Sequence, residues 1–208
     1  MYAPPAFAED RPEVLCAAMV RIRLGTLVSA TQAGLMVSHL PLFIQRDGDA
    51  VRLEGHLARA NPHWQAIGAG CASVAIFQGP HAYVRPGWYP SKAETGKVVP
   101  TWAYIAVHAH GALTATLDAD WLLRHLHAIT DAQEAGRDAP WSVDDAPPDY
   151  IAARMRGIVG VSLSVSQLMG SWKLNQNKSE ADQAGTAAGL TAAGPDGAAL
   201  AAAMTAPR

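Results

Sequence analysis

The chain has 208 residues, half of them hydrophobic, and 16 lysines and arginines stand against 18 aspartates and glutamates. This length can bury the core of one domain, and the balanced charge lacks the broad basic surface that nucleic-acid phosphates attract, so DNA as a partner has no support from charge. No run of eighteen apolar residues occurs, and the N-terminus has no basic region followed by an apolar stretch. We therefore expect a cytoplasmic protein with no signal peptide and no membrane span.

Helical and strand-like patterns follow one another along the chain. A helix is predicted from Pro12, because Asp10 and Glu13 have capping-box spacing and apolar residues recur at helical intervals until Gly25 breaks the pattern. Six strands are then predicted, at residues 25–30, 34–45, 50–58, 71–78, 99–116 and 157–168. Short connections favour antiparallel pairing, so the pattern predicts a mainly β fold: a closed, six-stranded antiparallel β-barrel with flanking helices.

Helices are predicted to flank the barrel, and a tail is predicted to end the chain. Asp118 has the pattern of an N-cap, residues 148–155 form a shorter helical pattern, and Ser179 precedes a third. From Thr191 the sequence lacks the large apolar side chains that would offset the entropy lost on ordering. We therefore expect one domain over residues 1–190 and a flexible Ala/Gly-rich tail over residues 191–208.

A polar cluster marks the end of the third predicted strand. His56, Arg59 and Asn61 combine an imidazole, a guanidinium and an amide. A guanidinium matches the oxygens of a phosphate two at a time, so this cluster can hold a phosphate, with Ser38 on the neighbouring strand as a further donor. The alternative is that Arg59 pairs with a surface carboxylate and that His56 is a hydrogen-bonded core histidine.

Several rare strings, rich in Trp, occur in a fixed order. They are GHLARANPHW at 55–64, FQGPHAYVRPGWYPSK at 77–92, VPTWAYIAVHAHG at 99–111 and GSWKLNQNKSEADQAG at 170–185, together with the opening MYAPPAF and the strand GLMVSHLPL at 34–42. In this order they resemble the PaiB-like family, the FMN-binding negative transcriptional regulators, whose fold is the FMN-binding split barrel. The likeness runs from Met1 to about Leu190, and it implies FMN as the cofactor with the polar cluster at its phosphate.

The same resemblance implies contacts with the isoalloxazine ring. In the string PTWAY, Thr101 can hydrogen-bond and Trp102 or Tyr104 can supply a flat wall, although alternating aromatic residues in a strand are equally typical of a core. The string WKLNQN is implied to reach the flavin, and to do so across a homodimer interface, because flavin pockets of split barrels commonly lie between two subunits. Its candidate contacts are Trp172, Lys173, Gln176 and Asn177.

A further aromatic stretch runs from His81 to Lys92. Its prolines and glycine predict an irregular loop, which could be a wall of the pocket or a dimer contact.

The chain departs from the family pattern at four positions. Arg85 and Gly87 stand where serines are usual, Ala103 replaces an asparagine, and Ser171 replaces a longer residue. The lost asparagine removes a hydrogen-bonding side chain near the predicted ring site.

His108 and His110 share one face of a predicted strand, as metal ligands in barrels often do. No carboxylate or cysteine completes a recognisable ligand spacing, so we predict no metal site.

Two functions follow from these patterns. The first is a homodimeric FMN-binding protein that acts as a negative transcriptional regulator or a flavin-dependent sensor. The alternative is a flavin-dependent reductase or oxidase that acts on a small molecule with NAD(P)H, which rests on the analogy of fold alone. The sequence assigns no catalytic residue, and no helix-turn-helix with a basic recognition face is visible.

Overall fold

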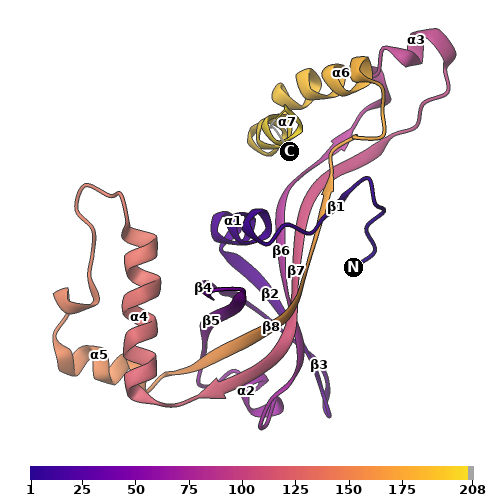
Figure 1. Cartoon of the computed structure of the whole chain (residues 1–208). Coiled ribbons are helices and arrows are strands. Elements are labelled where there is room, and N and C mark those ends of the chain that lie inside the picture. The colour runs from indigo at the N-terminus through magenta and orange to yellow at the C-terminus, as the bar shows by residue number, and fades with distance from the viewer. Residues whose placement is uncertain (206–208) are drawn as a thin grey trace. The chain divides into compact units, whose positions relative to one another are not determined.

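A computed structural model describes residues 1–205 of the chain (Figure 1). The strands are β1 Ala8–Glu9, β2 Leu24–Thr31, β3 Gly34–Pro41, β4 Phe43–Asp47, β5 Ala50–Ala58, β6 Cys71–Val84, β7 Thr101–Thr116 and β8 Ile158–Lys173. The α-helices are α1 Pro12–Ile22, α2 His63–Ala66, α3 Ser91–Thr95, α4 Ala119–Glu134, α5 Pro148–Met155, α6 Glu180–Thr191 and α7 Pro195–Thr205. Two 3₁₀ turns, η1 Pro86–Trp88 and η2 Val143–Asp145, complete the list of elements. Within residues 1–205, no helix combines the length and the apolar character needed to cross a membrane.

The strands form one sheet in the order β3-β2-β6-β7-β8-β5-β4, and β1 pairs with β8. The prediction of a mainly β protein with flanking helices is confirmed, but the prediction of six strands in a closed barrel is wrong. The predicted strand at 34–45 is divided at Leu42 into β3 and β4, and β1 adds an eighth strand. The sheet stays open because, in the part of the chain that the structure describes, β4 pairs with β5 alone and does not return to β3.

Long-range antiparallel pairing joins strands that are far apart along the chain. β5 pairs with β8 from Arg52 opposite Ser164 to Ala58 opposite Ile158, although the two strands are far apart along the chain. β2 pairs with β3 along its whole length and with β6 on its other side. Sequence patterns report the face that a strand buries but carry no signal for such distant partners.

The chain divides into two compact units, which are described separately. Unit 1 comprises residues 1–18 and 78–108 and the described residues from Met169 onward, and unit 2 comprises residues 19–77 and 109–168. The long strands β6, β7 and β8 contribute residues to both units.

In unit 2 the break after α1 has a different cause from the one predicted. Arg23 adopts a left-handed conformation with φ of 63°, and its N–H donates to the Met19 carbonyl at 2.8 Å. Gly25 lies inside β2 instead, where a Cβ would come within 2.8 Å of the Leu42 side chain. The glycine therefore permits close packing, and the arginine makes the turn.

In unit 1 the inward residues of β6 and β7 meet two helices. Val84, Ala103 and Ile105 pack with Leu174, Leu190, Leu200 and Tyr89 in one buried cluster. Figure 1 shows α6 and α7 beside the unit 1 segments of these strands. The C-terminal helices thereby cover one side of the unit 1 strands.

The structure places α7 where the sequence predicted a flexible tail. Leu200 is fully buried, and a Cβ at Gly197 would collide with the carbonyl oxygen of Leu190 in α6. Alanine is the best helix former, and small residues let two helices approach closely, so a helix forms with few large apolar side chains. Residues 206–208 lie outside the described residues, and the domain boundary at 190 stays a prediction.

Replacing Leu200 with alanine tests whether α7 packs in this way. Leu200→Ala should lower the free energy of unfolding by about 2–4 kcal/mol, because a fully buried leucine leaves a cavity when truncated. Urea denaturation followed by tryptophan fluorescence measures this change. The control Leu35→Ala, at a side chain that is 73% exposed, should change stability by less than about 0.5 kcal/mol. Equal effects of the two substitutions would contradict the packing of α7.

Candidate functional site

Arg59 lies in the turn that follows β5. Its backbone N–H donates to the Gly157 carbonyl at 2.8 Å, and its own carbonyl accepts from the Trp64 indole N–H at 2.9 Å. Its side chain is exposed, and no carboxylate within residues 1–205 pairs with it. The backbone is therefore held in place while the guanidinium remains available to an anion.

Asn61 and Ser38 come together as predicted, but their polar atoms are already engaged. The Asn61 amide donates to Ser38 Oγ at 3.0 Å, and Asn61 Oδ1 accepts from the His63 backbone N–H at 3.0 Å. Ser38 Oγ lies 2.9 Å from His63 Nδ1. Both residues thus shape the turn that carries Arg59.

His63 is the residue that sequence reasoning missed. Its side chain is fully buried, and Nε2 lies 2.8 Å from Ser29 Oγ, which in turn lies 2.7 Å from Ser73 Oγ. Burial lowers the pKa of His63, which favours the neutral imidazole. A neutral imidazole needs one donor and one acceptor, and rotatable serine hydroxyls can supply both. The sequence did contain a signal for this network, because Ser29, Ser38 and Ser73 each occupy an inward position of a predicted strand.

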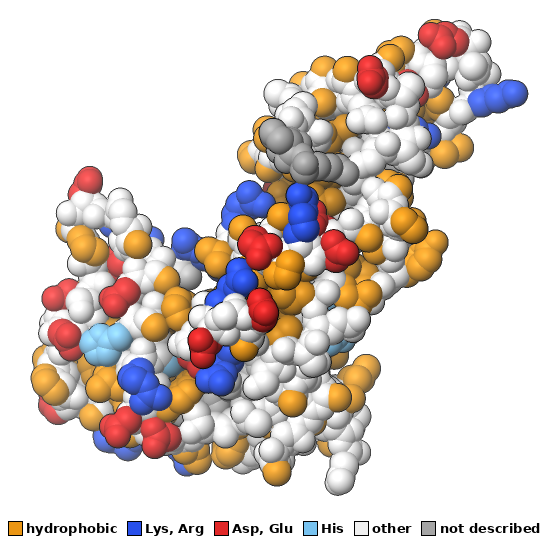
Figure 2. Space-filling view, viewed as in Figure 1, with side chains coloured by type: hydrophobic (Ala, Val, Ile, Leu, Met, Phe, Trp, Pro, Cys, Tyr) orange, Lys and Arg blue, Asp and Glu red, His pale blue; other side chains and the backbone are white. Residues whose placement is uncertain are grey.

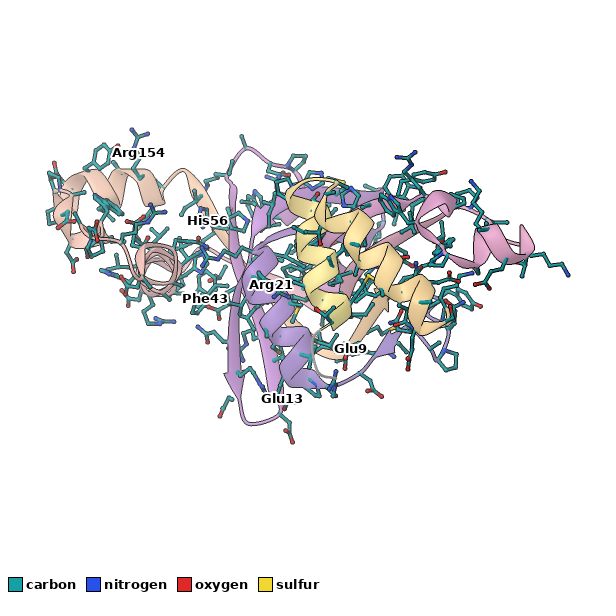
Figure 3. The ribbon with its side chains drawn as sticks, turned by 90° about the horizontal axis from the view of Figure 1, so that it is seen from above. Glu9, Glu13, Arg21, Phe43, His56 and Arg154 are labelled. Atoms are coloured by element: carbon teal, nitrogen blue, oxygen red, sulfur yellow. The ribbon has the colours of Figure 1, made fainter. Side chains whose placement is uncertain are left out.

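His56 lies apart from this group and faces α4. Its Nδ1 is 3.2 Å from His125 Nε2, and the two rings meet edge to face with centroids 5.4 Å apart. The Trp121 ring stacks on His125 at 5.2 Å. Figure 3 shows His56 between the strands and the helices of unit 2. The predicted phosphate cluster is thus divided, and the alternative of His56 as a hydrogen-bonded, largely enclosed histidine agrees with its contacts.

Burial changes the titration of both histidines. Burial lowers the pKa of His56, and burial followed by the neighbouring His56 lowers the pKa of His125 to about 4. His125 is 2% exposed, and its Nδ1 has no hydrogen-bond partner among the described residues. The pair is therefore neutral near pH 7.

In unit 1 one face of the strands carries exposed aromatic side chains. Trp102 on β7 is 53% exposed, and its ring centroid lies 6.1 Å from that of His81 and 6.2 Å from that of Tyr83, both on β6. On the same face of β7, the Tyr104 ring has Lys173 Nζ of β8 at 5.9 Å. We call these five residues the open aromatic face. The stretch containing His81 and Tyr83 is regular strand, which corrects the prediction of an irregular loop there; the loop begins only at Arg85.

The other predicted ring contacts take different positions. Thr101 alternates with Trp102, so its side chain points to the opposite side of β7. Trp172 packs against the buried cluster of unit 1, and Gln176 holds the following turn by accepting from the Leu174 N–H at 2.7 Å and donating to the Trp172 carbonyl. Asn177 is exposed. Of the predicted ring contacts, the open aromatic face contains Trp102, Tyr104 and Lys173.

Asn175, which sequence reasoning did not single out, holds the end of β8 against the helices. It is buried in a left-handed conformation with φ of 61°. Its amide donates to Tyr89 Oη and to Thr186 Oγ1, each at 3.2 Å. Asparagine tolerates this conformation better than most residues. Asn175 therefore has a structural role within the string WKLNQN.

The departures from the family pattern lie mostly away from the open aromatic face. Ala103 is fully buried on the side of β7 that α6 and α7 cover, and Ser171 is also buried. A Cβ at Gly87 would meet open space. The missing asparagine therefore changes the packed side of β7 and leaves the open aromatic face intact.

His108 and His110 lie on β7, where a metal site was not predicted. Within residues 1–205, no group of three or more His, Cys, Asp and Glu side chains is placed to hold a metal ion.

Replacing His63 tests the buried hydrogen-bond network. His63→Ala should lower the free energy of unfolding by about 3 kcal/mol, because it removes one hydrogen-bond partner from each of two buried serine hydroxyls and opens a cavity. Urea denaturation measures the loss. The control His39→Ala removes an exposed histidine whose side chain bonds Thr26 Oγ1 at 3.0 Å, and it should cost less than about 1 kcal/mol. A His63 variant as stable as the His39 variant would disprove the network's contribution.

The depressed pKa of His125 predicts acid sensitivity. As the pH falls, His125 is protonated near pH 6.5 in the unfolded state but only near pH 4 in the folded state. The stabilisation is therefore complete above pH 6.5 and is lost as the pH falls to about 4, by up to roughly 3 kcal/mol. Urea denaturation at a series of pH values measures this slope. His125→Phe should flatten it, whereas His127→Gln, on the same helix, should leave the contribution of His125 in place.

The fold of the chain resembles solved flavoproteins. The FAD and heme binding protein from Mycobacterium smegmatis matches with a TM-score of 0.60 at 16% identity, over 85% of this chain and 78% of that one. The flavocytochrome Anf3 from Azotobacter vinelandii matches with a TM-score of 0.58 at 15% identity, over 86% of this chain and 75% of that one. At these identities the likeness concerns the fold alone.

Sequence comparisons extend the likeness to a family. Residues 1–167 match the family described as "Putative FMN-binding domain". The "Protease synthase and sporulation protein PAI 2" of Bacillus subtilis is 33% identical over 182 residues, which cover 88% of this chain and 85% of that protein. The chain therefore belongs to the PaiB-like family of FMN-binding proteins, and its cofactor is FMN.

Proposed function

We propose that this protein is a cytoplasmic, FMN-dependent sensor with a negative regulatory role in transcription. The observation that carries the proposal is the Arg59 guanidinium, exposed and without an acidic partner in the described chain, on a turn whose backbone is fixed. FMN, when bound, supplies reversible electron transfer. The protein supplies binding, orientation and electrostatics.

The phosphate end of FMN requires charge-assisted donors. Arg59 can donate two parallel N–H bonds to phosphate oxygens, and no carboxylate of the described residues pairs with it. Asn61 and Ser38 support this contact by holding the turn through His63. His56 is bonded to His125 and is left out of the phosphate proposal.

The ring of FMN requires a flat wall and a positive group near the atoms that gain negative charge on reduction. Within unit 1 taken by itself, Trp102 offers such a flat wall, and Lys173 beside Tyr104 offers such a positive group. The other predicted contacts have weaker support. Thr101 points to the other side of β7, Trp172 packs against the buried cluster, and Gln176 is bonded within the turn. Asn177 is the fourth of these contacts. Each part of the cofactor can be tested separately.

The exposed aromatic side chains also favour a homodimer. Trp102 is 53% and Tyr83 is 46% exposed, and such residues are enriched in the cores of protein interfaces. We propose that a second copy of the chain covers the open aromatic face.

The regulatory part of the proposal rests on the relative and does not require direct DNA contact. The name of the Bacillus subtilis relative assigns it to protease synthesis and sporulation. Acidic and basic side chains are interleaved on the face shown in Figure 2, and the net charge is −2. A surface of this kind does not attract a phosphate backbone, so the sensor would act through a partner protein or a metabolite.

Flavin titration tests the phosphate contact. FMN titrated into the purified protein, followed by flavin fluorescence, should bind about 5 to 150 times more weakly to Arg59→Ala, which corresponds to roughly 1–3 kcal/mol for a lost charge-assisted bond. Riboflavin, which lacks the phosphate, should bind equally well to both proteins. The control Arg21→Ala removes an exposed arginine of α1 and should leave FMN affinity unchanged.

Two results would contradict the proposal. A protein that binds no FMN would remove the sensor function altogether. An Arg59→Ala variant that binds FMN as tightly as the native protein would remove Arg59 from the phosphate site.

A further inference from the structure

An open cavity lies within unit 2, apart from Arg59. Its volume is about 530 Å³, and it is bounded by the end of α1, the start of β2 and the last turns of α4. Leu24, Ile129 and Trp141 give it apolar walls, whereas Arg23, His56 and Glu134 bring polar groups to it. Cavities of this size and mixed lining are typical of small-molecule sites.

Arg23, which lines this cavity, has an unfavourable backbone conformation. Its φ of 63° is one that a residue with a Cβ seldom adopts, and glycine would adopt it at lower cost. Its Nη1 donates to Gln133 Oε1 of α4, and its Nε donates to the Val20 carbonyl at 3.3 Å. Nη2 has no hydrogen-bond partner in the described part of the chain. Strain of this kind concentrates at functional sites, and here it sets a cation at the edge of the cavity.

His56 contributes a second hydrogen-bond donor to the cavity. Its contact with His125 determines which ring nitrogen of His56 carries the proton. Nδ1 of His56 faces His125 Nε2, so Nε2 is the nitrogen of His56 left for the cavity. His125 Nδ1 is buried without a partner, and a buried N–H without an acceptor is rarer than a bare acceptor. The favourable arrangement therefore has His125 Nε2–H donating to His56 Nδ1. In this tautomer His56 carries its proton on Nε2 and presents an N–H donor.

Glu134 limits the charge that the cavity can accept. One of its carboxylate oxygens accepts from the Trp141 backbone N–H at 3.1 Å, and the other lies 3.4 Å from Arg137 Nε. The carboxylate is thus partly compensated, yet it disfavours a second negative charge nearby. One guanidinium and one neutral imidazole fit a single negative charge better than a phosphate dianion.

We propose that this cavity binds a small organic monocarboxylate with an aromatic or branched apolar body. The Arg23 guanidinium and the His56 Nε2–H donate to the carboxylate, and Leu24, Ile129 and Trp141 contact the body. The site is separate from the proposed FMN phosphate contact, because Arg59 does not line the cavity. The protein would thereby bind a metabolite in addition to its flavin.

Three matched probes test the charge requirement. Phenylacetate, its neutral counterpart phenylacetamide, and the dianion phenyl phosphate are titrated into the full chain by calorimetry at pH 7.5 in the presence of saturating FMN. Phenylacetate should bind at least about tenfold more tightly than either of the others, because only it matches both donors and the single charge. Equal affinities of phenylacetate and phenylacetamide, or no binding of phenylacetate at millimolar concentration, would overturn the proposal.

A glycine variant separates the binding role of Arg23 from its structural role. Arg23→Gly removes the cation at a backbone position that suits glycine, so the melting temperature should be kept or raised while phenylacetate affinity falls at least about tenfold. His56→Phe should weaken phenylacetate binding as well, and Arg21→Ala on the neighbouring turn of α1 should leave it unchanged. Unaltered phenylacetate affinity in a folded Arg23→Gly protein would overturn the proposal. FMN affinity should be unaffected by Arg23→Gly, so failure here is distinguishable from failure of the FMN site.

Discussion

The turn after β5 depends on one buried imidazole. His63 bonds Ser38 of β3 and Ser29 of β2, and Asn61 closes the connection by bonding both Ser38 and the His63 backbone. This network holds the turn from which Arg59 projects. A phosphate-binding guanidinium gains affinity when its backbone is already ordered before the ligand arrives, because less conformational entropy is then lost on binding. In the proposed phosphate site, the polar residues near Arg59 would contribute by fixing the backbone that positions its guanidinium.

In unit 2 the buried histidines form hydrogen bonds without carrying charge, and arginines supply the positive charge. Burial lowers the pKa of His63, His56 and His125 and so keeps these side chains uncharged. Each neutral imidazole forms hydrogen bonds, and its neighbours decide which ring nitrogen donates and which accepts. The positive charges near the two proposed sites come from Arg59 and Arg23, which cannot lose a proton in the physiological range. This division lets each proposed site keep its positive charge while the three imidazoles stay uncharged.

Alternation along β7 separates packing from exposure in unit 1. Ala103 and Ile105 enter the buried cluster, while Trp102 and Tyr104 occupy the open aromatic face. A departure from the family pattern on the packed side, such as Ala103, can therefore change the core without altering the exposed rings. The same alternation on β8 places Trp172 toward the cluster and Lys173 toward Tyr104.

The sequence by itself determined the family, the β-rich antiparallel character and the α1 and α4 helices, because periodicity, caps and rare strings are local signals. Only the tertiary structure decided the open eight-stranded order, the pairing of β5 with β8 and the packing of α7, since these depend on partners distant along the chain. It also divided the predicted polar cluster, sending His56 to His125 and tying Asn61 and Ser38 to His63. A residue type states which bonds a side chain can make, and the neighbours that the fold brings to it decide which bonds it does make.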